Sequence, residues 1–212
     1  MKIGIFDSGI GGLTVLKELI INKPNNHYIY VGDTLNLPYG AKSKKELREC
    51  VDKTIQYLIS REVSAIIIAC GTVSATLYGE LINDYNVKMF NIITPTIDYI
   101  NQSKFKNIGV IATVNTINSG LFQSGLVNKN VYPYACPSLA SLIEENSDKT
   151  EGHIEEILSN FKDKSIDLLV LGCTHYPIVN DVFTKKHNLN TLNMSIPLIK
   201  YIDEGVTSNV EI

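Results

Sequence analysis

Two cysteines occupy positions where their thiols could act as an acid and a base. Cys70 and Cys173 each follow a short apolar segment, at 65–69 and 168–172, and each precedes small polar residues able to donate hydrogen bonds. A single cysteine in such a place is most often a buried hydrophobic side chain. Two at equivalent positions favour a chemical role, because nearby donors and helix N-termini lower the pKa of a thiol and make the thiolate a usable base near neutral pH.

A pair of thiols on opposite sides of a cleft suits inversion at a carbon acid. One base removes a proton from one face of the carbon, and the conjugate acid of the other returns a proton to the opposite face. Disulfide exchange favours a CxxC motif, which the sequence lacks, and acyl transfer needs one nucleophile with a partnered histidine and an oxyanion hole. His175, two residues after Cys173, is the histidine to which we assign a function. A zinc site made of Cys70, Cys173 and His175 is the competing interpretation, although no fourth ligand is evident.

Two loops rich in glycine and polar residues follow the first two predicted strands. The run at 7–12 opens a helix, but it fails the dinucleotide-binding fingerprint, and the sequence has no GxxxxGK[ST] motif. Its backbone N–H groups are suited to a carboxylate as well as to a phosphate. The loop at 32–40, which includes Pro38 and Tyr39, is explained either by turn chemistry alone or by a second anion clamp.

Composition and charge exclude several classes of partner. The 212 residues carry 19 Lys and Arg against 22 Asp and Glu, and no basic cluster exceeds a helix-surface run such as 42–45, so an electrostatic footprint for nucleic acid is missing. The apolar segments fall well short of the roughly 20 residues that span a bilayer, and Asp7 lies too early for a signal peptide. We expect a cytoplasmic protein with no membrane or nucleic-acid partner.

The hydrophobic pattern along the chain predicts an α/β fold. Short segments rich in Ile and Val alternate with longer segments of helical period, as in parallel sheets covered by helices on both faces. The predicted strands are 2–6, 27–31, 64–69, 87–91, 107–111, 131–134 and 167–171. The predicted helices are 11–22, 44–61, 74–84, 115–127, 137–145, 151–161 and 178–186.

The two halves of the chain resemble each other. Segments 2–8 and 107–113 both pair Ile-Gly with a small polar residue at the carboxyl end. The apolar segments that end in Cys70 and Cys173 are separated along the chain by nearly the same number of residues as these two segments. We infer two similar α/β domains with mainly parallel sheets and the active site in the cleft between them. The first domain is placed at 1–92 plus 190–212 and the second at 93–189, because Thr94-Pro95 breaks the pattern.

Polar side chains from both domains should meet in this cleft, because ligands bind at the carboxyl ends of parallel strands. The residues expected there are Asp7, Ser8, Cys70 and Thr72 from the first domain and Thr113, Cys173, Thr174 and His175 from the second. The cleft then holds one thiol on each side.

These residues resemble the cofactor-independent glutamate racemases of the aspartate/glutamate racemase superfamily. The matching stretches run in family order over about residues 2–178: segment 3–15, Gly-Asp-Thr at 32–34, Pro-Tyr-Gly at 38–40, Ala-Cys at 69–70, Ala-Thr at 112–113 through Thr116 and Ser119, Ala-Cys-Pro at 135–137, Ile-Glu-Glu at 143–145, and Leu-Gly-Cys-Thr-His-Tyr-Pro at 171–177. Gly-Cys-Thr-His favours the glutamate branch, since aspartate racemases usually carry Glu at the position of His175.

The resemblance implies that Cys70 and Cys173 are an acid/base pair, one acting on D-glutamate and the other on L-glutamate. It also implies that Asp7 assists Cys70, and that Glu144 and His175 assist Cys173. The substrate-binding residues that it implies are Asp7, Ser8, Pro38, Tyr39, Gly40, Gly71, Thr72, Thr113, Thr116, Thr174 and His175. No metal, pyridoxal phosphate or nucleotide is implied as a cofactor. A homodimer and a role in peptidoglycan synthesis, and so in cell-wall biogenesis and cell shape, are expected on the same ground.

The chain departs from the family pattern in two places. The family motif after the first cysteine is Cys-Asn-Thr, whereas Gly71 stands here between Cys70 and Thr72. Losing such an amide contact changes binding or rate by roughly 5- to 150-fold, because it costs on the order of 1–3 kcal/mol. The chain also ends at Ile212, where members usually continue for a further strand and helix, and it has Asn-Met-Ser at 193–195 where they often have Ile-Asp-Ser.

The hypothesis from the sequence is therefore a glutamate racemase that works by proton transfer between two cysteines. One alternative is a racemase of another acidic amino acid such as aspartate, which Gly71 motivates. A second is a racemase-like protein that binds a dicarboxylate or a protein partner without turnover, motivated by Gly71 and the early end of the chain. A redox or zinc protein is the third.

Overall fold

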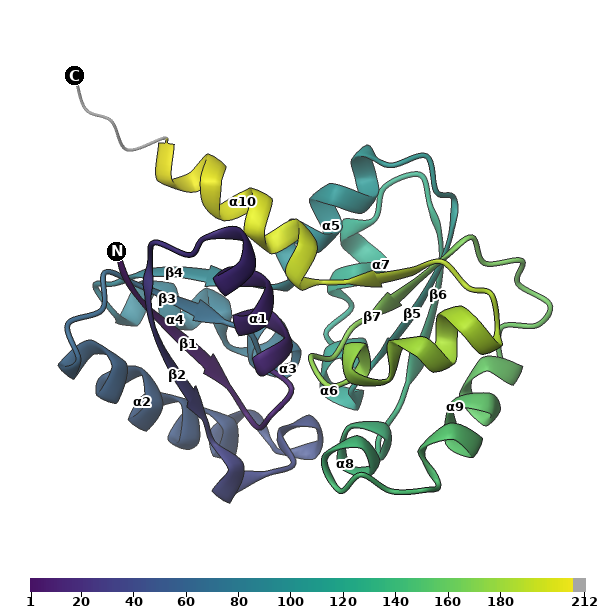
Figure 1. The fold of residues 1–212 in the computed structure, drawn as a ribbon, viewed down its shortest axis with the longest axis horizontal. Coiled ribbons are helices and arrows are strands. Elements are labelled where there is room, and N and C mark those ends of the chain that lie inside the picture. The colour runs from purple at the N-terminus through teal and green to yellow at the C-terminus, as the bar shows by residue number, and fades with distance from the viewer. Residues whose placement is uncertain (208–212) are drawn as a thin grey trace.

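Two four-stranded parallel sheets form the framework of the molecule, and they lie in two lobes side by side (Figure 1). The computed structural model describes residues 1–207, so the last part of the segment 190–212 lies outside the described residues. The first sheet has the order β2-β1-β3-β4 and consists of β1 (Lys2–Asp7), β2 (His27–Gly32), β3 (Ala65–Ile68) and β4 (Lys88–Asn91). The second has the order β6-β5-β7-β8 and consists of β5 (Asn107–Ala112), β6 (Asn130–Ala135), β7 (Leu168–Leu171) and β8 (Thr191–Asn193).

The two sheets repeat one plan, which confirms the predicted α/β fold with duplicated domains. In each sheet the first strand pairs with both the second and the third, and the third pairs with the fourth. Cys70 and Cys173 follow the corresponding strands β3 and β7. The duplication thus places the two thiols at equivalent strand ends.

Helices cover the sheets and connect the strands (Figure 1). The α-helices are α1 (Leu13–Asn22), α2 (Lys44–Ser60), α3 (Gly71–Thr76), α4 (Tyr78–Asp84), α5 (Ile93–Gln102), α6 (Val114–Asn118), α7 (Leu121–Gly125), α8 (Leu139–Glu144), α9 (Thr150–Ser159) and α10 (Ser195–Thr207). Short 3-10 turns are η1 (Thr34–Asn36), η2 (Tyr39–Ala41) and η3 (Tyr176–Val179), and η4 (Val182–Lys186) is a π-helical turn.

Helix α2 shows why the sequence pattern works where it is strong. Ser43 and Glu46 form a capping box, in which each side chain accepts a hydrogen bond from the backbone N–H of the other residue. The apolar stripe at three- and four-residue spacing is fully buried and consists of Leu47, Val51, Ile55 and Leu58. Cap and stripe together fix the start and the buried face of this helix.

Several helix boundaries differ from the prediction. The helix expected at 74–84 starts earlier and is split at Leu77, and the one expected at 115–127 is split because Gly120 adopts a φ of 70°, a left-handed conformation that ends a helix. The segment 178–186 forms a 3-10 turn and a π-helical turn. The sequence pattern does not predict helix α5, because Pro95 interrupts it. Pro95 lies in the first turn of this helix, where a missing N–H is tolerated.

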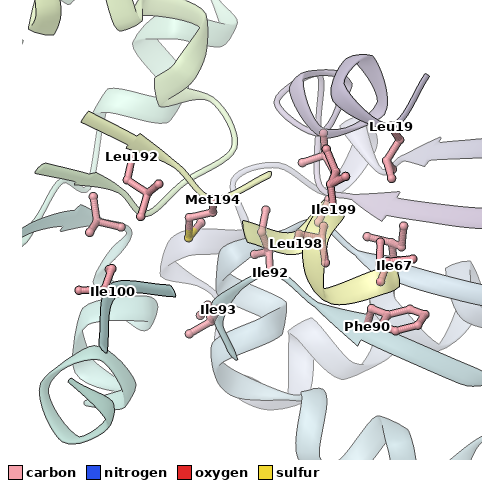
Figure 2. Close-up of a cluster of buried hydrophobic side chains, with 14 of the residues drawn as sticks. Leu19, Ile67, Phe90, Ile92, Ile93, Ile100, Leu192, Met194, Leu198 and Ile199 are labelled. Carbon is pink, nitrogen blue, oxygen red and sulfur yellow. The ribbon is translucent and has the colours of Figure 1, made fainter. Parts of the chain in front are cut away.

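The segment after residue 190, expected with the first domain, contacts both lobes. Strand β8 pairs with β7 in the second sheet, whereas α10 contacts α1 and α5. Figure 2 shows Leu192 and Met194 on the path from β8 into α10, and Leu198 and Ile199 packed near the residues of the first sheet. One buried cluster therefore runs from the first sheet into the second and joins the lobes at the end of the chain.

Candidate active site

One cavity of about 230 Å³ lies between the two lobes at the carboxyl ends of their strands. The predicted site residues that line it are Ser8, Pro38, Tyr39, Gly40, Cys70, Gly71, Thr72, Thr113, Glu144, Cys173, Thr174 and His175. Asp7 and Thr116 are fully buried and do not line the cavity, but each bonds a lining residue. Both predicted cysteines thus face the same space from different lobes.

Six further residues line the cavity that were not among the predicted site residues, although two of them, Pro137 and Glu145, lie within the matching stretches. They are Leu37, Ala41, Pro137, Ala140, Ser141 and Glu145. Ala140 and Ser141 lie four and three residues before Glu144 in α8, so helical spacing from Glu144 would have found them. Leu37 and Ala41 flank the predicted loop, and no chemical signal marks these apolar residues.

The thiol of Cys70 stands at the end of β3, where Cys70 is the N-cap of α3. Its Sγ lies 3.8 Å from the Ser8 Oγ. Burial and the nearby Asp7 carboxylate together raise the pKa of Cys70 to about 12, although hydrogen bonds from the Val73 and Thr72 N–H groups oppose the rise. Cys70 is therefore held as a thiol, able to donate a proton, at neutral pH.

The thiol of Cys173 lies beside an imidazole. Its Sγ is 3.6 Å from Nδ1 of His175, and burial raises the pKa of Cys173 well above its usual value. The other ring nitrogen of His175, Nε2, lies 2.5 Å from the Glu144 Oε2. If Nε2 carries the proton that bonds Glu144, Nδ1 is left as an acceptor for the proton of the Cys173 thiol.

Glu144 is itself held in place from the first lobe. Both of its carboxylate oxygens lie 3.4 Å from the backbone N–H of Ile10, in the glycine-rich loop after β1. The Glu144 side chain is 20% exposed, whereas that of His175 is buried. The carboxylate thus orients the His175 ring toward Cys173 and ties that orientation to the approach of the two lobes.

Asp7 joins the lobes from beneath the cavity. Its carboxylate is fully buried and accepts hydrogen bonds of 3.0 Å from the Gly9 N–H and from the Thr174 hydroxyl. Burial raises the pKa of Asp7, and the neighbouring His175 and these two donors oppose the rise. Thr14 adds a second link, donating a bond of 3.1 Å to the Thr174 carbonyl.

A chain of hydroxyls crosses the opposite side of the cavity. The Thr72 Oγ1 lies 2.9 Å from the Thr113 Oγ1, which lies 2.9 Å from the Thr116 Oγ1. The Asn115 side-chain amide also crosses, donating a bond of 2.8 Å to the Lys42 carbonyl. These contacts supply donors and acceptors at the cavity wall and hold the lobes together there.

Two tyrosines support the loops around the cavity. The Tyr39 hydroxyl donates a hydrogen bond of 2.6 Å to Asp33, so its oxygen remains free to accept a hydrogen bond from another group. The Tyr30 hydroxyl donates to the Gly9 carbonyl and so fixes the loop that carries Asp7 and Ser8. Sequence reasoning missed Tyr30, which lies within a strand, and it noted Asp33 in the Gly-Asp-Thr stretch at 32–34 without assigning it a role in the site.

Residues 1–207 hold neither a metal-binding cluster nor a membrane-spanning helix. No group of three or more His, Cys, Asp and Glu side chains in this part of the chain is arranged to hold a metal ion. None of the helices described has the length and the apolar composition needed to cross a membrane.

Known proteins resemble both the sequence and this arrangement. The family model described as Asp/Glu/Hydantoin racemase matches residues 16–208. A glutamate racemase of Hydrogenobaculum sp. is 38% identical over 214 residues, which cover 97% of this chain and 83% of that protein. The crystal structure of the Francisella tularensis glutamate racemase in complex with D-glutamate has 36% identity and a TM-score of 0.88, covering 98% of this chain and 81% of that one. A Bacillus anthracis glutamate racemase isoform has 28% identity and a TM-score of 0.90, covering 98% and 82%.

Proposed function

The chain belongs to the Asp/Glu/Hydantoin racemase family and is an amino-acid racemase, and we propose that it interconverts L- and D-glutamate by proton transfer between Cys70 and Cys173. The observation that carries the mechanism is the pair of buried thiols from equivalent strand ends that line one cavity. Glutamate is favoured as the substrate because the relatives at 36–38% identity are glutamate racemases.

In the proposed reaction the α-carbon of the substrate lies between the two thiols. In one direction His175 accepts the proton of the Cys173 thiol, the resulting thiolate removes the α-proton, and Cys70 delivers its proton to the opposite face. The forward step leaves Cys70 as a thiolate and His175 protonated. The reverse direction starts from this state: Cys70 removes the α-proton, Cys173 delivers its proton to the opposite face, and His175 returns its proton to Cys173. Hydroxyl donors in the water-poor cavity stabilise the charge that develops on the α-carboxylate as the carbanion forms.

Substrate binding is assigned to the polar groups of the cavity wall. Ser8, Thr72 and Thr174 offer hydroxyls to the carboxylates, and Tyr39 offers a hydroxyl oxygen to the ammonium group. Thr113 bonds Thr72 across the cleft, so the donors from the two lobes converge. The carboxylate of Glu144 disfavours a second anionic group close to it, which orients the substrate in the cavity.

The experiment that tests this proposal is a racemisation assay without added cofactor. Purified protein is incubated with L-glutamate, L-aspartate or L-alanine, and the chirality of each is followed by circular dichroism. We expect inversion of glutamate and its loss in both Cys70→Ser and Cys173→Ser. Turnover of aspartate alone would replace glutamate as the substrate, and tight binding of glutamate without turnover would contradict the catalytic proposal.

We also propose that the product D-glutamate supplies peptidoglycan synthesis in the cytoplasm. The support is the similarity to glutamate racemases. Expression in a bacterial strain that requires D-glutamate should restore growth without the supplement. Growth that still depends on added D-glutamate, with the protein present and folded, would contradict this role.

A homodimer is part of the same proposal. It is supported by the exposed apolar side chains Ile10, Leu13 and Ile178, which gather around a shallow surface depression where α1 meets the turn after Cys173. Light scattering at increasing protein concentration should give twice the mass of one chain. A monomer at all concentrations would contradict it.

A further inference from the structure

Four glycines of the first lobe face residues of the second across the cleft. A Cβ atom on Gly9 would lie 3.0 Å from a Glu144 carboxylate oxygen, and one on Gly40 would lie 2.9 Å from the Thr113 Cβ. One on Gly11 would meet the His175 ring at 2.5 Å. The last of the four, Gly71, would place its Cβ 2.8 Å from the Gly172 carbonyl oxygen. At these four positions the first lobe thus presents backbone without a side chain to the second.

Gly71 differs from the other three in the kind of atom that it meets. Glu144, Thr113 and His175 oppose their glycines with side-chain atoms, whereas Gly172 opposes Gly71 with its backbone carbonyl, which has no rotamer to change. The φ of Gly71 lies outside the left-handed region, so its backbone conformation alone does not require glycine. The close approach of the Gly172 carbonyl is what leaves no space for a side chain at position 71.

Gly172 is fixed within the second lobe and has no room to yield. Its N–H donates a bond of 2.7 Å to the Ile111 carbonyl, and a Cβ on Gly172 would lie 2.7 Å from that oxygen and 2.8 Å from the Ala112 Cβ. A side chain at position 71 must therefore push the second lobe, or α3, away as a unit. The backbone contact between Gly71 and Gly172 is a stop that determines how closely the lobes approach.

This stop lies directly beside both thiols in the chain, since Cys70 precedes Gly71 and Cys173 follows Gly172. We propose that Gly71 is a positioning residue that sets the separation of the two thiols across the cavity, an inference that rests on the proposed two-thiol racemisation. Glycine at position 71 lets the backbones of the two lobes meet there, and an Asn side chain in its place would push them apart.

The test compares Gly71→Ala and Gly71→Asn with two matched controls, Gly79→Ala and Gly152→Ala. Gly79 lies in α4 and Gly152 in α9, both are exposed, and a Cβ on either has no neighbour within 4 Å. Alanine suits a helix at least as well as glycine, so all three alanine variants should fold. Kinetics of glutamate racemisation and the rates at which iodoacetamide alkylates Cys70 and Cys173 are measured for each protein.

We expect both Gly71 variants to lose roughly 10- to 100-fold in kcat, with a smaller change in KM, because misplacement of reacting groups by about 1 Å costs about 100-fold. Cys70 and Cys173 should be alkylated severalfold faster than in the wild type, while the rate for Cys136, which lies outside the cavity, stays unchanged. Both controls should behave as the wild type.

Unchanged alkylation of both thiols in Gly71→Ala would overturn the proposal. A Gly71→Ala protein that fails to fold would also overturn the proposal, because we expect the added Cβ to separate the lobes and not to unfold them. If the wild type does not racemise glutamate, the proposed function fails, but the alkylation rates still decide whether Gly71 sets the approach of the lobes.

Discussion

At the scale of single residues, the protonation of the two thiols depends on burial more than on any charge. Cys70 and Cys173 were identified from their types and positions in the sequence, but the motif alone would have made them acidic thiols. The structure holds both as thiols, because burial removes them from water and raises the pKa of each. His175 and Glu144 then become the means of ionising Cys173.

Glu144→Gln tests the orientation of His175. The amide keeps the shape but removes the negative charge beside Nε2, so we expect kcat to fall by roughly 10- to 100-fold, less than the up to 10⁴-fold that loss of a general base itself costs. Glu156→Gln is the matched control, because Glu156 pairs with His153 at 3.4 Å on the surface. Steady-state kinetics decide, and equal rates for the two variants would contradict the role of Glu144.

Burial of thiols also predicts how stability changes with pH, and Cys136 isolates the effect outside the cavity. Burial raises its pKa from 9.0 to about 12, so the unfolded chain loses the proton first, and the stability present below pH 9 is lost as the pH rises toward 12. In urea denaturation, the free energy of unfolding of the wild type should fall as the pH rises above 9, and it should fall more steeply than that of Cys136→Ala, by about 1 kcal/mol per pH unit. Parallel curves for the two proteins would show that the thiol is not shielded.

At the scale of elements, strong local patterns were predictable and weak ones were not. Strands β1 to β7 and helix α2 follow from apolar runs and a capped amphipathic stripe. The sequence does not reveal β8 and α10, because β8 has only three residues and α10 is held by contacts with α1 and α5 that are remote in sequence. The same limit applies to the site: the strand ends were predictable, while the lining residues of α8 depend on how the lobes pack.

Helix α10 should contribute to stability through one face. Leu198 is fully buried in the cluster that spans both lobes, whereas Ile196 on the same helix is 45% exposed (Figure 2 labels Leu198). We expect Leu198→Ala to lower the free energy of unfolding by about 2–5 kcal/mol and Ile196→Ala by less than about 0.5 kcal/mol. Urea denaturation of both variants checks this, and similar losses would show that α10 is not anchored as described.

At the scale of the whole molecule, the duplicated lobes make the site only where they meet. Each lobe supplies one thiol, and polar contacts cross the cleft on both sides of the cavity, from Asp7 to Thr174 and from Thr72 to Thr113. The similar segments that end in Cys70 and Cys173 predicted that the site lies between the two lobes. The distance of approach could not be predicted, because it depends on backbone contacts such as that of Gly71 with Gly172.

Asn115→Ala should weaken this closure without harming either lobe. The lost bond to the Lys42 carbonyl crosses the cleft, and at about 1 kcal/mol it should raise KM about fivefold with little change in kcat. Asn83→Ala is the control, because the Asn83 amide bonds the Gly79 carbonyl within one helix. A rise in KM for both variants, or for neither, would contradict the assignment.

The central claim is that a proton leaves one face of the substrate to one thiol and another proton arrives from the second thiol. The most direct measurement is the early reaction of L-glutamate in D₂O, stopped at a few per cent conversion, with the α-position of each enantiomer examined by NMR and mass spectrometry. Because thiol protons exchange with solvent, the account predicts that the D-glutamate formed carries deuterium while the remaining L-glutamate retains its proton. D-glutamate that keeps the original proton would indicate a single base and contradict the account.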